Sequence, residues 1–134
     1  MTRLIGSDAS DDQDTSQNSA KEAMERQTAH DKPAAQALQM SYTQQIASKS
    51  LNMQVSGRIW DYEEIWNQWL DFKARFPKAL LIWSGDFANY QRRGTTNFYV
   101  VLSGESFSSQ SQAQQWCSSA GLGSDDCVVR MIGK

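Results

Sequence analysis

The chain has 134 residues, a formal net charge of −2, two cysteines and one histidine. This length suits one ordinary domain. No apolar run reaches the roughly 18 to 20 residues of a membrane span, and the start lacks the basic and apolar stretches of a secretion signal, which predicts a cytoplasmic location. Residues 56–134 hold eight basic and eight acidic side chains, so we do not expect a nucleic-acid-binding surface.

Residues 1–54 differ sharply in composition from the rest. Every Trp and Phe follows residue 59, and an early aspartate cluster lies among Ser, Gln and Asn. So little apolar surface does not offset the entropy lost on ordering. Helix-forming residues dominate 20–50. We therefore predict a disordered acidic tail and a partly helical linker over 1–54, followed by a folded domain over 55–134.

The first elements of that domain follow from periodicity and capping. Residues 55–60, VSGRIW, alternate with period two, as a short strand does. Asp61, with Glu64 three residues later, predicts the start of a helix. Apolar side chains then recur every three or four residues until Pro77 ends the helix.

Three more strands and a second helix follow. The helix has Ser108 or Ser109 as its candidate cap and Gly121 at its left-handed end, and its Ser/Gln tract forms the solvent-exposed face. The strands are predicted at 79–83, 98–102 and 127–132. The fold class is therefore α+β, a ferredoxin-like βαββαβ arrangement with a four-stranded antiparallel sheet. Right-handed crossovers place both helices on one face and leave the other face open.

An enzyme is not expected. The single histidine, His30, lies in the predicted linker, so the domain lacks a general base for a Ser or Cys nucleophile. Two cysteines without a nearby histidine do not complete a metal site, and no Gly-rich phosphate loop follows a strand, so no cofactor is expected either. Cys117 and Cys127 are ten residues apart, and both a disulfide and a pair of buried thiols fit them.

The open sheet face is the predicted binding surface. If Ile59, Val100 and Leu102 point toward the helices, alternation turns their neighbours outward. Aromatic and arginine side chains there suit flat ligands that stack on rings. The predicted ligand-binding residues, rim included, are Arg58, Trp60, Trp83, Tyr90, Arg92, Tyr99, Val101 and Arg130. The alternative is that the N-terminal segment, or a second copy in a homodimer, covers this face.

The stretch FYVVLSGESFSSQSQAQQWCSSAGL, with CVVRMI after it, resembles a half-repeat of the SPOR (sporulation-related repeat) family. The matching features are Gly104 ending a strand, Phe107 three residues on, Ala113 opening the helical face, and Val128-Val129-Arg130 in the returning strand. The Trp-Cys pair and the later Asp-Asp-Cys also resemble SPOR-like segments of actinobacterial envelope proteins.

The resemblance implies a bacterial, non-catalytic module that binds peptidoglycan glycan strands stripped of stem peptides on its sheet face. It also implies a place in the cell envelope. Two alternatives stay open. One is a protein-interaction or scaffold domain using the same face. The other is single-stranded RNA binding, which the neutral charge disfavours.

Overall fold

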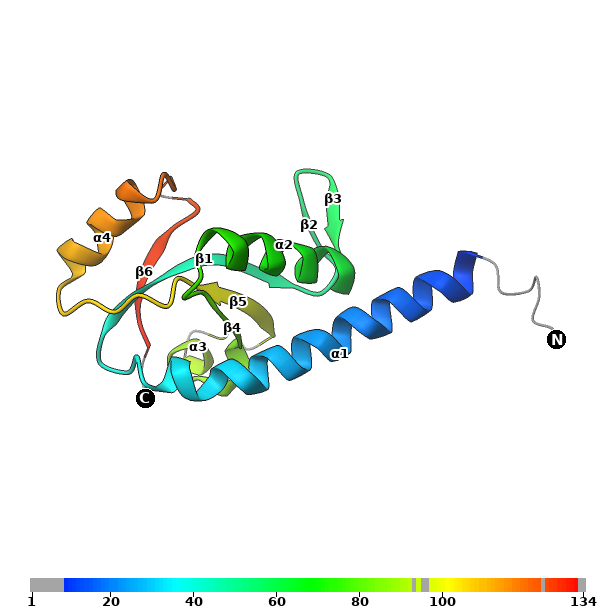
Figure 1. Cartoon of the computed structure of the whole chain (residues 1–134), viewed down its shortest axis with the longest axis horizontal. Coiled ribbons are helices and arrows are strands. Elements are labelled where there is room, and N and C mark those ends of the chain that lie inside the picture. The colour runs from blue at the N-terminus through cyan, green and yellow to red at the C-terminus, as the bar shows by residue number, and fades with distance from the viewer. Residues whose placement is uncertain (1–8, 93, 95–96, 124, 133–134) are drawn as a thin grey trace.

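The computed structural model describes residues 9–92, 94, 97–123 and 125–132. Figure 1 shows a long N-terminal helix lying along one side of a small sheet, with further helices around that sheet. The elements in chain order are α1 (Ala9–Gln36), β1 (Tyr42–Ser50), β2 (Met53–Val55), β3 (Arg58–Trp60), α2 (Tyr62–Arg75), β4 (Leu80–Trp83), the 3-10 turn η1 (Ser84–Asp86), α3 (Ala88–Arg92), β5 (Phe98–Leu102), α4 (Gln110–Ser119) and β6 (Val128–Met131).

Four strands form one antiparallel sheet in the order β4-β5-β1-β6. The predicted α+β class with a four-stranded antiparallel sheet is confirmed, and it is compatible with a ferredoxin-like type of arrangement. The predicted succession of elements is wrong at its start. The first strand of the sheet is β1, from the region that we expected to be a linker, and not residues 55–60.

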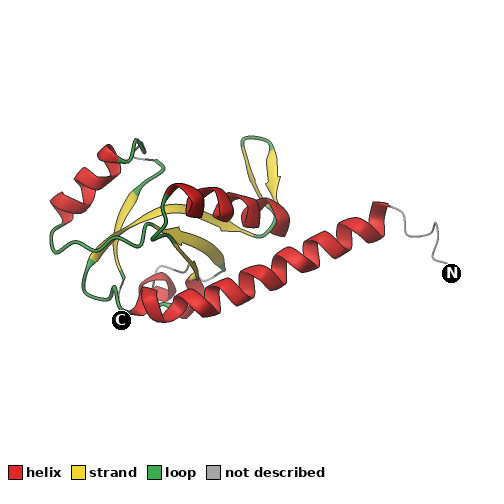
Figure 2. Cartoon of the chain, viewed as in Figure 1, coloured by secondary structure: helices red, strands yellow, loops and turns green. Residues whose placement is uncertain are grey.

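Residues 53–60 form a separate two-stranded hairpin. Strands β2 and β3 pair with each other, with Val55 opposite Arg58. The two residues between them, Ser56 and Gly57, have positive φ angles of 54° and 78°. Positive φ at both central positions is typical of the tight turn that matches strand twist. The hairpin therefore projects from the body (Figure 2) and does not join the sheet.

Helix α1 spans residues 9–36, where we expected a disordered tail leading into a partly helical linker; residues 1–8 lie outside the described part. It packs against β4 and α2. The Gln17 side chain accepts a hydrogen bond from the backbone N–H of Tyr62 at 3.0 Å. Met24 is fully buried, and the buried Asp31 carboxylate accepts from the backbone N–H of Leu81 at 2.9 Å. Tertiary contacts of this kind order a helix whose own apolar stripe is weak.

One face of the sheet is covered by α2 and α4, as predicted. Ile65 and Trp69 of α2 and Cys117 of α4 share a buried cluster with Leu81 of β4 and Val101 of β5. The capping prediction is also confirmed for both helices. Their N-cap side chains, Asp61 and Ser109, each accept from a backbone N–H three residues later.

The opposite face is not open over β4 and β5. Ile82, Val100 and Leu102 are buried there under Phe87 and Tyr90. The end of α1 and the residue after β6 add to the same cluster through Ala35 and Ile132. The expected orientation of β5 is thus reversed, with Val100 and Leu102 facing away from α2 and α4. Both faces of β5 carry apolar side chains, and alternation alone does not say which face meets which helices.

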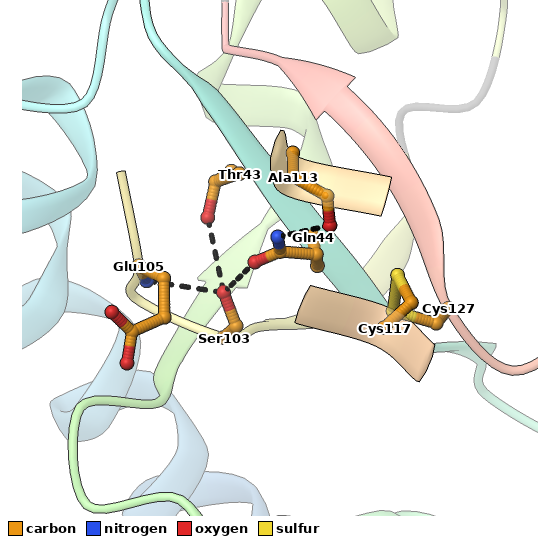
Figure 3. The surroundings of a disulfide bond; sticks show 7 residues. All are labelled: Thr43, Gln44, Ser103, Glu105, Ala113, Cys117 and Cys127. Carbon is orange, nitrogen blue, oxygen red and sulfur yellow. Dashed lines mark hydrogen bonds between the residues drawn. A yellow bond between two sulfur atoms is a disulfide. The ribbon is translucent and has the colours of Figure 1, made fainter. Parts of the chain in front are cut away.

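A buried polar network joins β1 to β5 and α4 beside a disulfide (Figure 3). The Ser103 hydroxyl donates a hydrogen bond to the side-chain carbonyl of Gln44. The side-chain NH2 of Gln44 donates in turn to the Ala113 backbone carbonyl at 2.8 Å. Thr43 and Ser103 hydroxyls lie 3.3 Å apart. Nearby, Cys117 and Cys127 form a disulfide that ties the end of α4 to the start of β6. These contacts bury polar side chains without leaving them unpaired.

Candidate functional site

The structure does not gather the predicted ligand-binding residues on one surface. Trp60, Tyr90 and Val101 are buried, with exposed fractions of 8%, 3% and 3%, contrary to the expected open face. Val101 faces α2 and α4, and Tyr90 packs on the opposite face, where its hydroxyl donates to the Gln45 side chain at 2.7 Å. Trp60 belongs to the hairpin, because the strand expected there is not in the sheet.

The arginines are also separated. Arg58 pairs with Glu64, and its guanidinium carbon lies 4.5 Å from the centre of the Trp60 ring. Arg130 of β6 is partly buried, and its Nε donates to Gln45 at 3.3 Å. Arg92 ends α3, and its side chain lies outside the described part of the chain. Arg58 and Arg130 therefore lie in different regions and do not form one basic surface.

Two predicted residues do come together. Trp83 ends β4 and Tyr99 lies on the neighbouring β5, directly opposite it in the antiparallel register. Residues opposite each other on one face of a sheet bring their side chains into contact. Accordingly, the two ring centroids are 4.7 Å apart, with the planes tilted by 59°. Both side chains are half-buried, so part of each ring stays accessible.

These rings line a pocket of about 420 Å³, which we call the aromatic pocket. Helix α1 supplies one wall, and the first residue of α2 and the turn η1 complete it. Its lining residues are Lys21, Glu25, Thr28, Tyr62, Trp83, Asp86 and Tyr99. The volume falls in the range of small-ligand sites, and the pocket combines ring faces with hydroxyl, carboxylate and ammonium groups. Such a set suits a flat ligand with polar groups on its rim, such as a sugar ring.

The surroundings of Tyr99 further favour its neutral form. Burial raises the pKa of its hydroxyl to about 12, and the neighbouring Tyr62 and the Glu25 carboxylate contribute in the same direction. A protonated phenol can both donate and accept a hydrogen bond. On the rim, Asp86 lies 3.9 Å from the ammonium of Lys32. Tyr99 therefore offers the pocket an uncharged polar group at neutral pH.

Sequence reasoning missed the contribution of α1. Lys21, Glu25 and Thr28 recur at intervals of three and four, so they lie on one side of the helix, but the segment lacks the aromatic residues that drew attention elsewhere. Only the docking of α1 against β4 and α2 brings them to Trp83 and Tyr99. The spacing shows a shared helix face and gives no sign of what that face meets.

The described residues contain no group of three or more His, Cys, Asp or Glu side chains placed to hold a metal ion. None of the described helices combines the length and the apolar character needed to cross a membrane.

Comparison of the chain with protein-family models, with curated proteins and with solved structures finds no match in any of the three.

Proposed function

We propose that this chain is a SPOR-like, non-catalytic module that binds the glycan strands of peptidoglycan at the aromatic pocket. The observation that carries the proposal is the pairing of the Trp83 and Tyr99 rings, 4.7 Å apart, in the wall of a pocket of about 420 Å³. The apolar C–H face of a sugar stacks on such rings. Hydroxyls around the sugar then meet the carboxylates and the ammonium of the rim.

The order of the sheet strands and their connecting helices supports this assignment. Taken in chain order, β1, α2, β4, β5, α4 and β6 give a βαββαβ succession. We infer from it a ferredoxin-like topology in which β1 takes the place expected for residues 55–60. The residues of the SPOR resemblance have structural roles consistent with a half-repeat. Gly104 turns the chain after β5, Phe107 bridges to Tyr42, and Ala113 is fully buried on α4.

The disulfide between Cys117 and Cys127 supports a place in the cell envelope. Disulfides persist in oxidising compartments and are rare where thiols are kept reduced. Since both cysteines of the chain are in this bond, no thiol is available as a nucleophile. The single histidine, His30, lies on α1 and does not line the aromatic pocket.

Sedimentation with purified sacculi tests the proposal. We expect the protein to bind sacculi, and to bind more after an amidase has removed the stem peptides and exposed the glycan. Trp83→Ala removes one stacking ring and should weaken the affinity for treated sacculi about tenfold, the effect of losing roughly 1.4 kcal/mol.

The matched control is Trp116→Ala, which removes a half-buried tryptophan of α4 outside the aromatic pocket. This variant should bind amidase-treated sacculi as the wild type does, and thermal melting should show both variants folded. Equal binding by folded Trp83→Ala protein, or no binding of treated sacculi by the wild type, would contradict the proposal.

A further inference from the structure

Strand β1 is paired on both sides along only part of its length. It pairs with β5 from Gln45 to Ser50, with an irregularity between Gln45 and Ala47. On its other side it pairs with β6 only from Tyr42 to Gln45. In the part of the chain that the structure describes, Ile46–Ser50 therefore have no neighbouring strand on the β6 side. Figure 1 shows β6 crossing β1 near its beginning, away from the later half.

A hollow of about 410 Å³ lies beside this unpaired stretch, and we call it the β1 edge groove. One wall is β1 itself, from Gln45 to Lys49. The other lining residues are Gln68, Phe72 and Arg75 of α2, and Leu122, Asp125, Asp126 and Val128 around the start of β6. The groove thus occupies the place that a longer β6 would fill. An added strand needs this kind of space beside an unpaired backbone.

Two cations line this groove without a carboxylate within ion-pair distance among the described residues. The Lys49 ammonium lies 4.6 Å from the centre of the Trp60 ring. Burial lowers the pKa of the Lys49 ammonium, and the negative charge of Asp126 offsets only part of this shift. The guanidinium carbon of Arg75 lies 4.9 Å from the ring centre of Phe76. By contrast, Arg58 and Lys78 each have a carboxylate partner, Glu64 and Glu105.

A ring face holds a cation in position but leaves its N–H donors available. Arg75 in particular presents a planar fork that matches a carboxylate. The groove lining carries two positive side chains, Lys49 and Arg75, and two negative ones, Asp125 and Asp126, which lie in the wall near β6. A carboxylate entering beside α2 would find two free donors there.

We propose that the β1 edge groove binds an extended acidic peptide of a partner protein, which adds a strand beside Ile46–Ser50 and pairs a carboxylate with Lys49 and Arg75. The regular donors and acceptors of an unpaired strand match a peptide backbone and not a sugar. Strand addition takes affinity from the main chain and specificity from alternate side chains. The site is separate from the aromatic pocket, since the two share no lining residue.

The test uses the whole chain and a fluorescent eight-residue peptide of alternating Val and Glu, with a Val/Lys peptide as its counterpart. We expect the Val/Glu peptide alone to raise fluorescence anisotropy, and hydrogen exchange of amides within Ile46–Ser50 to slow when it binds. The double variant Lys49→Glu/Arg75→Glu should weaken Val/Glu binding by at least about tenfold, that is roughly 1.4 kcal/mol or more. It should gain affinity for the Val/Lys peptide.

The control Arg26→Glu reverses an exposed charge on α1, outside the groove, and should bind the Val/Glu peptide normally. The double variant should still sediment with amidase-treated sacculi, so failure of this inference is distinguishable from failure of the glycan proposal. Absence of Val/Glu binding, binding without slower exchange in Ile46–Ser50, or equal binding by the double variant would overturn the inference. Loss of sacculus binding with peptide binding unchanged would assign the groove to glycan and would overturn it as well.

Discussion

Two strand edges of this sheet, the outer edge of β4 and the later half of β1 on its β6 side, differ in what covers them; we call them the β4 border and the β1 border. At β4, helix α1 lies along the strand, and the buried Asp31 carboxylate accepts from the Leu81 N–H. Along Ile46–Lys49 of β1, by contrast, β5 pairs with one side, no described strand pairs with the β6 side, and a groove remains there. Proteins generally cover strand borders, because exposed ones recruit other chains. Because the β4 border is covered and the β1 border is not, the β1 border is the candidate surface for strand addition by a partner.

The N-terminal third of the chain has a structural role in this contrast. Its helix seals one border, supplies a wall of the aromatic pocket and contributes Met24 to the core. It is therefore part of the folded body and of the aromatic pocket wall, where the composition predicted a disordered tail and a partly helical linker.

The largest expected effect comes from the loop that packs against the chain just before β4. Gly104 has a φ of +82°, and a Cβ added there would lie 1.8 Å from the backbone oxygen of Lys78. Because a backbone oxygen cannot move aside cheaply, Gly104→Ala should lower the free energy of unfolding by about 4 kcal/mol or more. Urea denaturation measures this.

The control is Gly121→Ala, at a φ of +77° with no atom within 4 Å of the added Cβ. That variant has backbone strain without a clash, and we expect a loss of about 1 kcal/mol. Similar losses in the two variants would show that the packing of Gly104 against Lys78 does not hold the β4 border.

Removing the disulfide should have the next largest effect, on the border beside β1. The bond closes a loop with a sequence separation of 10, next to the acidic wall of the groove. The double variant Cys117→Ser/Cys127→Ser should lose about 2 to 3 kcal/mol of unfolding free energy. Thermal melting with and without a reductant measures this, because reduction of the wild type should reproduce the effect. An unchanged melting temperature under full reduction would contradict the prediction.

Breaking the hydrogen bond between Asp31 and Leu81 at the edge of β4 should lower the unfolding free energy slightly less. Asp31→Ala leaves the buried N–H of Leu81 without an acceptor, which costs about 1 to 3 kcal/mol. Asp31→Asn keeps a side-chain oxygen and should recover part of that loss. Denaturation curves compare the two, and size-exclusion chromatography checks whether Asp31→Ala also self-associates through the exposed border. Equal stability of Asp31→Ala and the wild type would contradict the claim that the Asp31–Leu81 hydrogen bond stabilises the edge at β4.

The smallest effect concerns Tyr99, which pairs with β1 on one side and β4 on the other. Its pKa is raised from 10.0 to about 12 in the folded protein, so folding favours the neutral phenol. The resulting stability is fully present below pH 10 and is lost as the pH rises from 10 to 12. Tyr99→Phe should therefore lose less stability than the wild type across this interval. Parallel denaturation curves at pH 9 and pH 11 would detect the difference, and identical pH dependence would contradict it.

Much of the fold could be predicted because its signals are local. The strand Phe98–Leu102 lies where its apolar run placed it, and the helices following Asp61 and Ser109 begin at their predicted caps. Strand β1 could not be found in this way. Its buried Thr43 and Gln44 are polar, and Gln44 is satisfied by a carbonyl 69 residues away, so no local pattern marks the strand.

Two of the seven residues that line the aromatic pocket were predicted as ligand-binding residues for a similar reason. Trp83 and Tyr99 stood out as large aromatic side chains at strand positions, and the register brings them together. Lys21 and Glu25 have no such signal, since their position depends on the docking of α1. Trp60 was misplaced because the turn at Ser56 and Gly57 converts an apparent strand into a hairpin.

Residue-resolved hydrogen exchange tests the contrast between the two borders most directly. The account predicts that the Leu81 amide exchanges slowly and that Asp31→Ala abolishes its protection. It also predicts that amides of Ile46–Lys49 alternate between slow exchange toward β5 and fast exchange toward the groove. Fast exchange at Leu81 in the wild type, or slow exchange at all four residues from Ile46 to Lys49, would contradict it.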